Sequence, residues 1–86
     1  MKNIFNLTQY CFYFNFPVMF EPYYKDNKSV HNIVIKGVHL KDEFEMGVPL
    51  VEDVIEKVEK LFPDYELKHK WDNIAGTKAQ LIFEVK

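Results

Sequence analysis

The sequence predicts an α+β domain with the element order β-β-α-β-β, in which a single four-stranded, mainly antiparallel sheet carries one helix packed on one face. Apolar residues alternate with period two near both ends of the chain, which is typical of half-buried strands. One segment between them has apolar residues at helical spacing instead. A chain of 86 residues suits one compact domain, residues 1–86, and not two.

The first predicted strand is the aromatic stretch "YCFYFNFPVMF", residues 10–20. Its large apolar side chains recur at every second position, so one strand face would be fully apolar. The residues on this apolar face would be Tyr10, Phe12, Phe14, Phe16, Val18 and Phe20. Pro17 has no N–H for a ladder and suggests an edge position or a break near the strand end. The next residues, 21–29, are rich in turn formers and are expected to be a loop.

The second predicted strand, residues 30–41, changes its alternation in the middle. Ile33 and Ile35 share one parity, whereas Val38 and Leu40 have the other. One extra residue at Gly37 would turn all four toward the core, and a glycine inside a strand often marks such a bulge.

The helix is predicted over residues 49–62, after a second loop. Its core stripe is Val51, Val54, Ile55, Val58, Leu61 and Phe62. Pro49 suits a first helical position, and Pro63 ends the helix.

Two further strands are predicted at residues 65–71 and 79–86, joined by a hairpin loop. Tyr65, Leu67, His69 and Trp71 share one face of the first of them. The predicted common core is Phe12, Phe14, Phe16, Val54, Ile55, Val58, Leu67, Trp71, Leu81 and Phe83.

The basic side chains are all lysine, and the net charge is −2. Arginine provides the planar fork that binds phosphates and guanine edges, so its absence argues against a dedicated nucleic-acid binder.

Cys11 is the only cysteine, which excludes an internal disulfide and favours a small buried side chain. The lysine-rich, arginine-free composition is typical of an AT-rich genome, such as that of a low-GC bacterium or its phage.

Residues 42–59 hold seven acidic side chains and one lysine, which gives −6 there and +4 for the rest of the chain. Such a run is most often a solvated face, but it also fits a surface that enters a basic groove. "DEFEMG" favours the second interpretation because it sets an aromatic and a methionine among carboxylates. The candidate partner-binding residues are Asp42, Glu43, Phe44, Glu45, Met46, Glu52, Glu56 and Glu59.

Motifs for catalysis or metal binding are not evident in the sequence. His31, His39 and His69 lack a tight ligand spacing, and no nucleophile elbow or phosphate-cradling glycine loop is present. We therefore expect no enzyme activity, no metal and no cofactor.

Together these observations predict a small cytoplasmic binding protein, encoded by a phage or mobile element. Its expected partner is a host protein with a basic groove, such as a CRISPR effector or restriction enzyme, and it would contact neither nucleic acid nor membrane directly. Two alternatives remain open. One is a single-stranded nucleic-acid binder, which would use Tyr13, Tyr23, Tyr24, Lys25, Lys28 and Lys36. The other is a homodimer or other homo-oligomeric accessory subunit, which would bury Tyr13, Val34 and Ile82 on the open sheet face.

Overall fold

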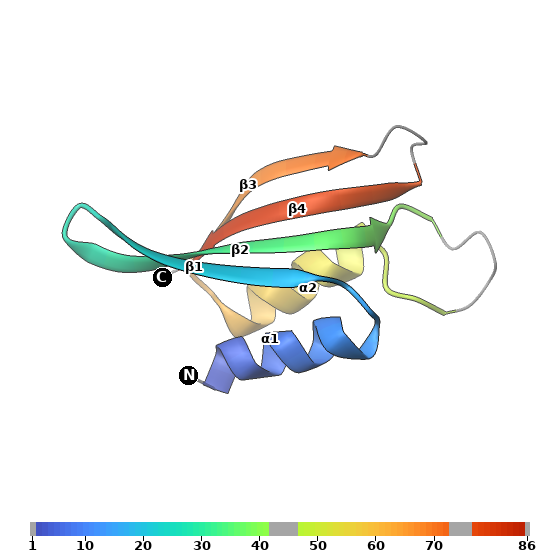
Figure 1. Cartoon of the computed structure of the whole chain (residues 1–86), viewed down its shortest axis with the longest axis horizontal. Coiled ribbons are helices and arrows are strands. Elements are labelled where there is room, and N and C mark those ends of the chain that lie inside the picture. The colour runs from blue at the N-terminus through green and yellow to red at the C-terminus, as the bar shows by residue number, and fades with distance from the viewer. Residues whose placement is uncertain (1, 42–46, 73–76, 86) are drawn as a thin grey trace.

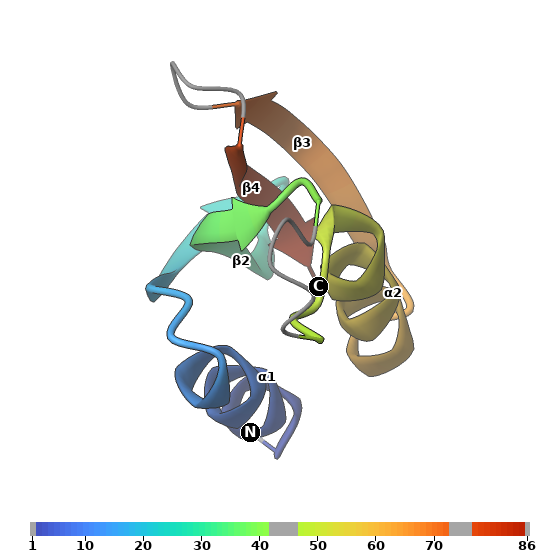
Figure 2. The ribbon, with the colours of Figure 1, turned by 90° about the vertical axis from the view of Figure 1, so that its right-hand side faces the viewer.

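The computed structural model describes residues 2–41, 47–72 and 77–85, except for the side chains of residues 2, 71 and 72. The elements are α1 (Lys2–Tyr13), β1 (Val18–Lys25), β2 (Lys28–His39), α2 (Val51–Leu61), β3 (Tyr65–Asp72) and β4 (Lys78–Val85). The strands form one antiparallel sheet in the order β1-β2-β4-β3. Both helices lie on the same side of this sheet (Figures 1 and 2). The α+β class and the four-stranded sheet are thus confirmed.

The N-terminal segment corrects the sequence prediction. Residues 2–13 form helix α1, so the strand predicted over 10–20 is wrong for most of its length and the domain has a second helix. Leu7 and Cys11, one helical turn apart, are fully buried. Phe12, predicted in the core, is 78% exposed because it lies on the opposite side of the helix. The sheet instead gains β1 from residues of which most were predicted as a loop.

Asn15 ends α1 through a left-handed backbone conformation, with φ of 60°. The Asn15 N–H donates to the carbonyl of Phe12 at 3.1 Å, and the Phe16 N–H donates to the carbonyl of Cys11 at 2.8 Å. This pair of bonds is the Schellman motif, in which a left-handed residue satisfies carbonyls at the helix end. Phe16 and Cys11 are both buried in the same cluster, so the motif also carries its usual hydrophobic contact.

A tight turn at Asp26 and Asn27 joins β1 to β2. Both residues have positive φ, 52° and 64°, which matches the two-residue turns that suit twisted hairpins. β1 is an edge strand, and Pro22 lies within it, where it withholds one N–H from any further strand.

The predicted bulge in β2 is confirmed. Ile35 pairs with Leu81 and Val38 with Ala79, so two β2 residues stand opposite one residue of β4. Gly37 has a φ of 70°, which an L side chain adopts only at a cost. As a result Ile33, Ile35 and Val38 are all fully buried on the same face.

A second bulge, in β3, was not predicted. Leu67 pairs with Phe83, whereas His69 pairs with Ile82, so Lys68 is the extra residue. His69 therefore lies in the same row as Ile82, on the sheet face that the helices do not cover, which we call the uncovered sheet face. Simple alternation in the sequence predicted instead that His69 and Leu67 share one face. Trp71 was predicted in the core, and its side chain lies outside the described part.

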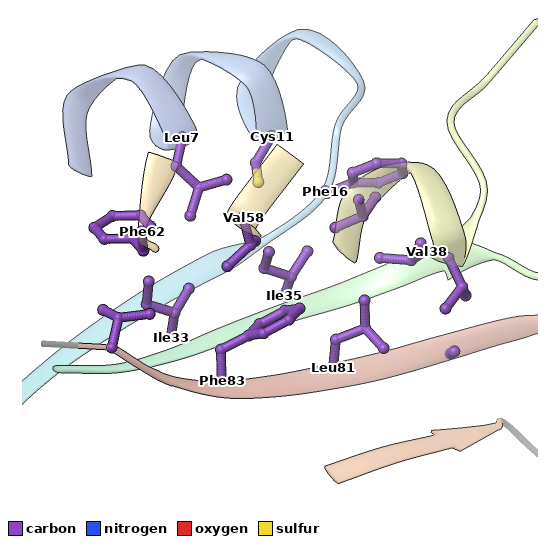
Figure 3. Close-up of a cluster of buried hydrophobic side chains, with 14 residues drawn as sticks. Leu7, Cys11, Phe16, Ile33, Ile35, Val38, Val58, Phe62, Leu81 and Phe83 are labelled. Carbon is purple, nitrogen blue, oxygen red and sulfur yellow. The ribbon is translucent and has the colours of Figure 1, made fainter. Parts of the chain in front are cut away.

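The core lies between the two helices and the sheet, and Figure 3 shows side chains from both layers meeting there. Its buried members are Leu7, Cys11, Phe16, Ile33, Ile35, Val38, Val51, Val54, Val58, Phe62, Ala79, Leu81, Phe83 and Val85. Phe14, Ile55 and Leu67, also predicted, pack against this cluster while partly exposed. The Asn3 side chain donates a hydrogen bond of 2.8 Å to the carbonyl of Leu61, and so joins the start of α1 to the end of α2.

Candidate protein-binding surface

Helix α2 separates apolar and acidic residues onto opposite sides. Val51, Val54 and Val58 are buried against the sheet. Glu52, Glu56 and Glu59, at spacings of four and three, are exposed on the outer side. The structure therefore brings together the three helical members of the predicted site, on a rigid element with a fixed direction.

The other charged side chains of α2 have local roles. The carboxylate of Asp53 accepts the N–H of Leu50 at 3.0 Å and so satisfies a backbone donor at the helix start. The Lys57 ammonium lies 5.4 Å from the centre of the Tyr10 ring on α1. Lys60 pairs with Glu56 at 3.2 Å, and both side chains remain exposed. Since an exposed pair is screened by water, Glu56 keeps most of its attraction for an external cation.

A shallow, open hollow lies between these acids. It is lined by Glu52, Ile55, Glu56, Glu59 and Lys60. Ile55 is partly buried and packs against the core, so its exposed portion forms an apolar floor with carboxylates around it. We call this surface the α2 acidic face. It can receive a lysine or arginine side chain, whose methylene stem would rest on Ile55 while its charge meets a glutamate.

Five candidate residues, Asp42, Glu43, Phe44, Glu45 and Met46, lie outside the described residues. They directly precede residues 47–50, which lead into α2. Their role stays a sequence prediction.

Within the described residues, no three His, Cys, Asp or Glu side chains gather into a metal site. His39 contacts the Phe16 ring with a centroid distance of 6.2 Å, while His31 lies in β2 and His69 in β3. Cys11 is buried, and burial raises the pKa of its thiol to about 11, so it is not a ready nucleophile.

Glu84 is the one charged residue that the described part of the chain buries, at 7% exposure. Its carboxylate accepts the Tyr23 hydroxyl at 2.6 Å and pairs with Lys25 at 3.2 Å and Lys68 at 3.6 Å. The Tyr23 hydrogen bond, helped by Lys25 and Lys68, holds the pKa of Glu84 below its ordinary value against the effect of burial. The same hydrogen bond raises the pKa of Tyr23 to about 12. The alternation of residues in the sequence gives no signal for this cluster.

The residues proposed for stacking nucleic-acid bases are dispersed. Tyr23 and Lys25 are engaged with Glu84, whereas Tyr24 follows Tyr23 in the strand and so points to the opposite face of β1. Tyr13 lies on α1, in the helical layer. Val34 and Ile82 do share the uncovered sheet face as cross-strand neighbours, but without Tyr13.

The fold and this surface define a small α+β domain with an acidic helix face. Comparison with known protein families, curated proteins and solved structures finds no significant match. Among the described residues, no helix has the length and apolar character needed to cross a membrane.

Proposed function

We propose that this protein binds and blocks a nucleic-acid-processing enzyme of its host by placing the α2 acidic face in the enzyme's basic groove. The observation that carries the proposal is the outward row of Glu52, Glu56 and Glu59 around Ile55. Carboxylates repeated along one side of a helix offer a cationic groove the same sign of charge as a phosphate backbone. Folding does not require acids at these exposed positions, because the core stripe of α2 lies on its other side.

The acidic residues Asp42, Glu43 and Glu45 would extend this surface along the chain, and Phe44 and Met46 would serve as apolar anchors. The proposed class of target is nucleic-acid-processing enzymes, because the grooves in which such enzymes hold nucleic acid are basic. A CRISPR effector or a restriction enzyme of a bacterial host fits this description, and a phage or mobile element would encode the inhibitor.

The test is competition. Tagged protein is used to capture partners from a host lysate, and the captured enzyme is then assayed for nucleic-acid binding with and without the purified protein. We expect a nucleic-acid-processing enzyme whose substrate binding falls as the protein is added. The variant Glu52→Gln/Glu56→Gln/Glu59→Gln should lose this competition.

The matched control is Glu21→Gln, which removes an exposed acid from β1 on the uncovered sheet face. The proposal fails if the captured enzyme still binds its substrate normally, or if the triple variant and the control compete equally well.

A further inference from the structure

The outer side of α1 has an unusual surface for a helix on a small domain. Phe5, Phe12 and Tyr13 are 61%, 78% and 77% exposed, and they are three of the five large hydrophobic side chains exposed in the described chain. Gln9 lies between the two phenylalanines on the same side. We call Phe5, Gln9, Phe12 and Tyr13 the α1 outer face. No residue from Asn3 to Tyr13 is charged.

We propose that the α1 outer face is the contact between two copies of this chain. The first argument is charge. A partner with a basic groove would lose hydration at this surface without gaining an ion pair, because α1 offers no acidic side chain there. The α2 acidic face would repel its own copy, and Pro22 and the β3 bulge protect the two sheet edges against pairing. A second α1 is neutral and apolar in the same places.

The second argument is shape. An open hollow beside Phe12 is lined mainly by apolar and amide groups, from Asn6, Gln9, Tyr10, Phe12, Tyr13, Phe14 and Lys57. A protruding aromatic side chain next to a hollow is what a two-fold contact requires, since each copy presents both parts to the other. Lys57, which already lies over the Tyr10 ring, would also face an incoming aromatic ring.

The third argument is spacing along the helix. Phe5 and Phe12 are seven residues apart, about 10.5 Å along the axis, and the midpoint between them falls beside Gln9. Two antiparallel copies would therefore set Phe5 of one against Phe12 of the other, with the two Gln9 side chains meeting near the axis. A glutamine amide can pair with its own copy because it both donates and accepts. Short helices bury little area, so the dimer is weak and forms at high micromolar concentration.

Site-directed cross-linking tests this geometry. Gln9→Cys places a thiol near the axis, and Glu21→Cys is the control on the uncovered sheet face; the native Cys11 is buried in both. Under mild oxidation we expect Gln9→Cys to form covalent dimers at least about tenfold faster than Glu21→Cys, because the docked copies raise the local thiol concentration. Adding Phe12→Glu should return the rate to that of the control.

Sedimentation velocity gives an independent measurement on the unmodified chain. We expect a concentration-dependent dimer that Phe12→Glu removes. Equal cross-linking of both cysteine variants, or a monomer up to about 1 mM, would overturn the proposal. A monomer that binds phosphatidylcholine vesicles through Phe12 would also overturn it, and would assign the face to a lipid surface. These measurements do not involve the α2 acidic face, so their outcome is independent of the proposed function.

Discussion

Single residues decide where the elements of this fold begin and end. Asn15 turns the chain out of α1, Asp26 and Asn27 reverse it between β1 and β2, and Gly37 shifts the register of β2; each has positive φ. Gly37 was recognisable because a glycine inside an alternating strand often marks a bulge. Asn15 was not recognisable as a helix end, because a polar residue at this position also fits the solvent-facing side of the strand predicted over residues 10–20. An asparagine followed closely by a proline is the local signal for a helix end that could have revealed α1.

Replacing Asn15 tests this role. Asn15→Val should lower the free energy of unfolding by about 1–3 kcal/mol, because a β-branched residue is strained at a φ of 60°. Asn15→Gly should be close to wild type, since glycine adopts this conformation readily. Urea denaturation measures both, and equal stability of the two variants would refute the helix end described above.

Glu84 makes a prediction for pH. Its folded-state pKa is below the ordinary 4.5, so its stabilising effect is complete above that value and is lost as the pH falls through the lower folded pKa. Tyr23 behaves oppositely: its pKa is raised from 10.0 to about 12, so its contribution is lost as the pH rises across that interval. We would measure the midpoint of urea denaturation as a function of pH. Glu84→Gln should reduce the loss of stability at both acidic and alkaline pH, whereas the control Glu21→Gln should not. Parallel curves for wild type and Glu84→Gln would show that the cluster does not control stability.

At the scale of elements, the sequence predicted β2, α2, β3 and β4 but misassigned most of residues 10–25. Each later element has one dominant apolar period, and tertiary packing agrees with it apart from the predicted shift at Gly37 and the unpredicted shift at Lys68. The N-terminal stretch satisfies two periods: Tyr10, Phe12 and Phe14 alternate, while Leu7 and Cys11 are one helical turn apart. Aromatic residues are enriched in strands, yet here they belong to a helix, and a helix buries only the residues on its core-facing side. The aromatic residues on the other side of α1 remain exposed. The alternation therefore predicted core positions, such as Phe12, that the structure leaves at the surface.

Cys11 reports directly on the packing of α1. Its side chain is fully buried and its thiol pKa is raised to about 11, so in the native state it should react with a thiol reagent on the order of 100-fold more slowly than in urea. Leu7→Ala, which opens the same contact, should accelerate the native reaction. A wild-type thiol that reacts at the rate of the unfolded chain would show that α1 is not docked.

At the scale of the whole molecule, the described surfaces differ in charge. The outer side of α2 is acidic, α1 is neutral from Asn3 onward, and the uncovered sheet face carries the cluster around Glu84. The acidic surface was partly predictable, since helical spacing fixes the side on which Glu52, Glu56 and Glu59 lie. The neutral surface was not predictable, because it exists only once residues 2–13 are helical.

We expect the fold to tolerate neutralisation of the α2 acidic face. Glu52, Glu56 and Glu59 are exposed, and the ion pair between Glu56 and Lys60 is exposed as well. Each Glu→Gln change should therefore alter the free energy of unfolding by no more than about 0.5 kcal/mol. Thermal melts of the triple variant should overlay those of Glu21→Gln; a large loss of stability would mean that these acids have a structural role.

The proposed function depends on the α2 acidic face binding a basic groove, and its sharpest test is the association rate with the captured enzyme as a function of salt. Exposed interface charges act mainly on association, and their attraction is screened as ionic strength rises. For wild type we predict an association rate that falls steeply with salt. For Glu52→Gln/Glu56→Gln/Glu59→Gln we predict a rate about tenfold lower at low salt and nearly independent of salt. A triple variant that associates as fast as wild type, with the same salt dependence, would show that the α2 acidic face does not enter the groove.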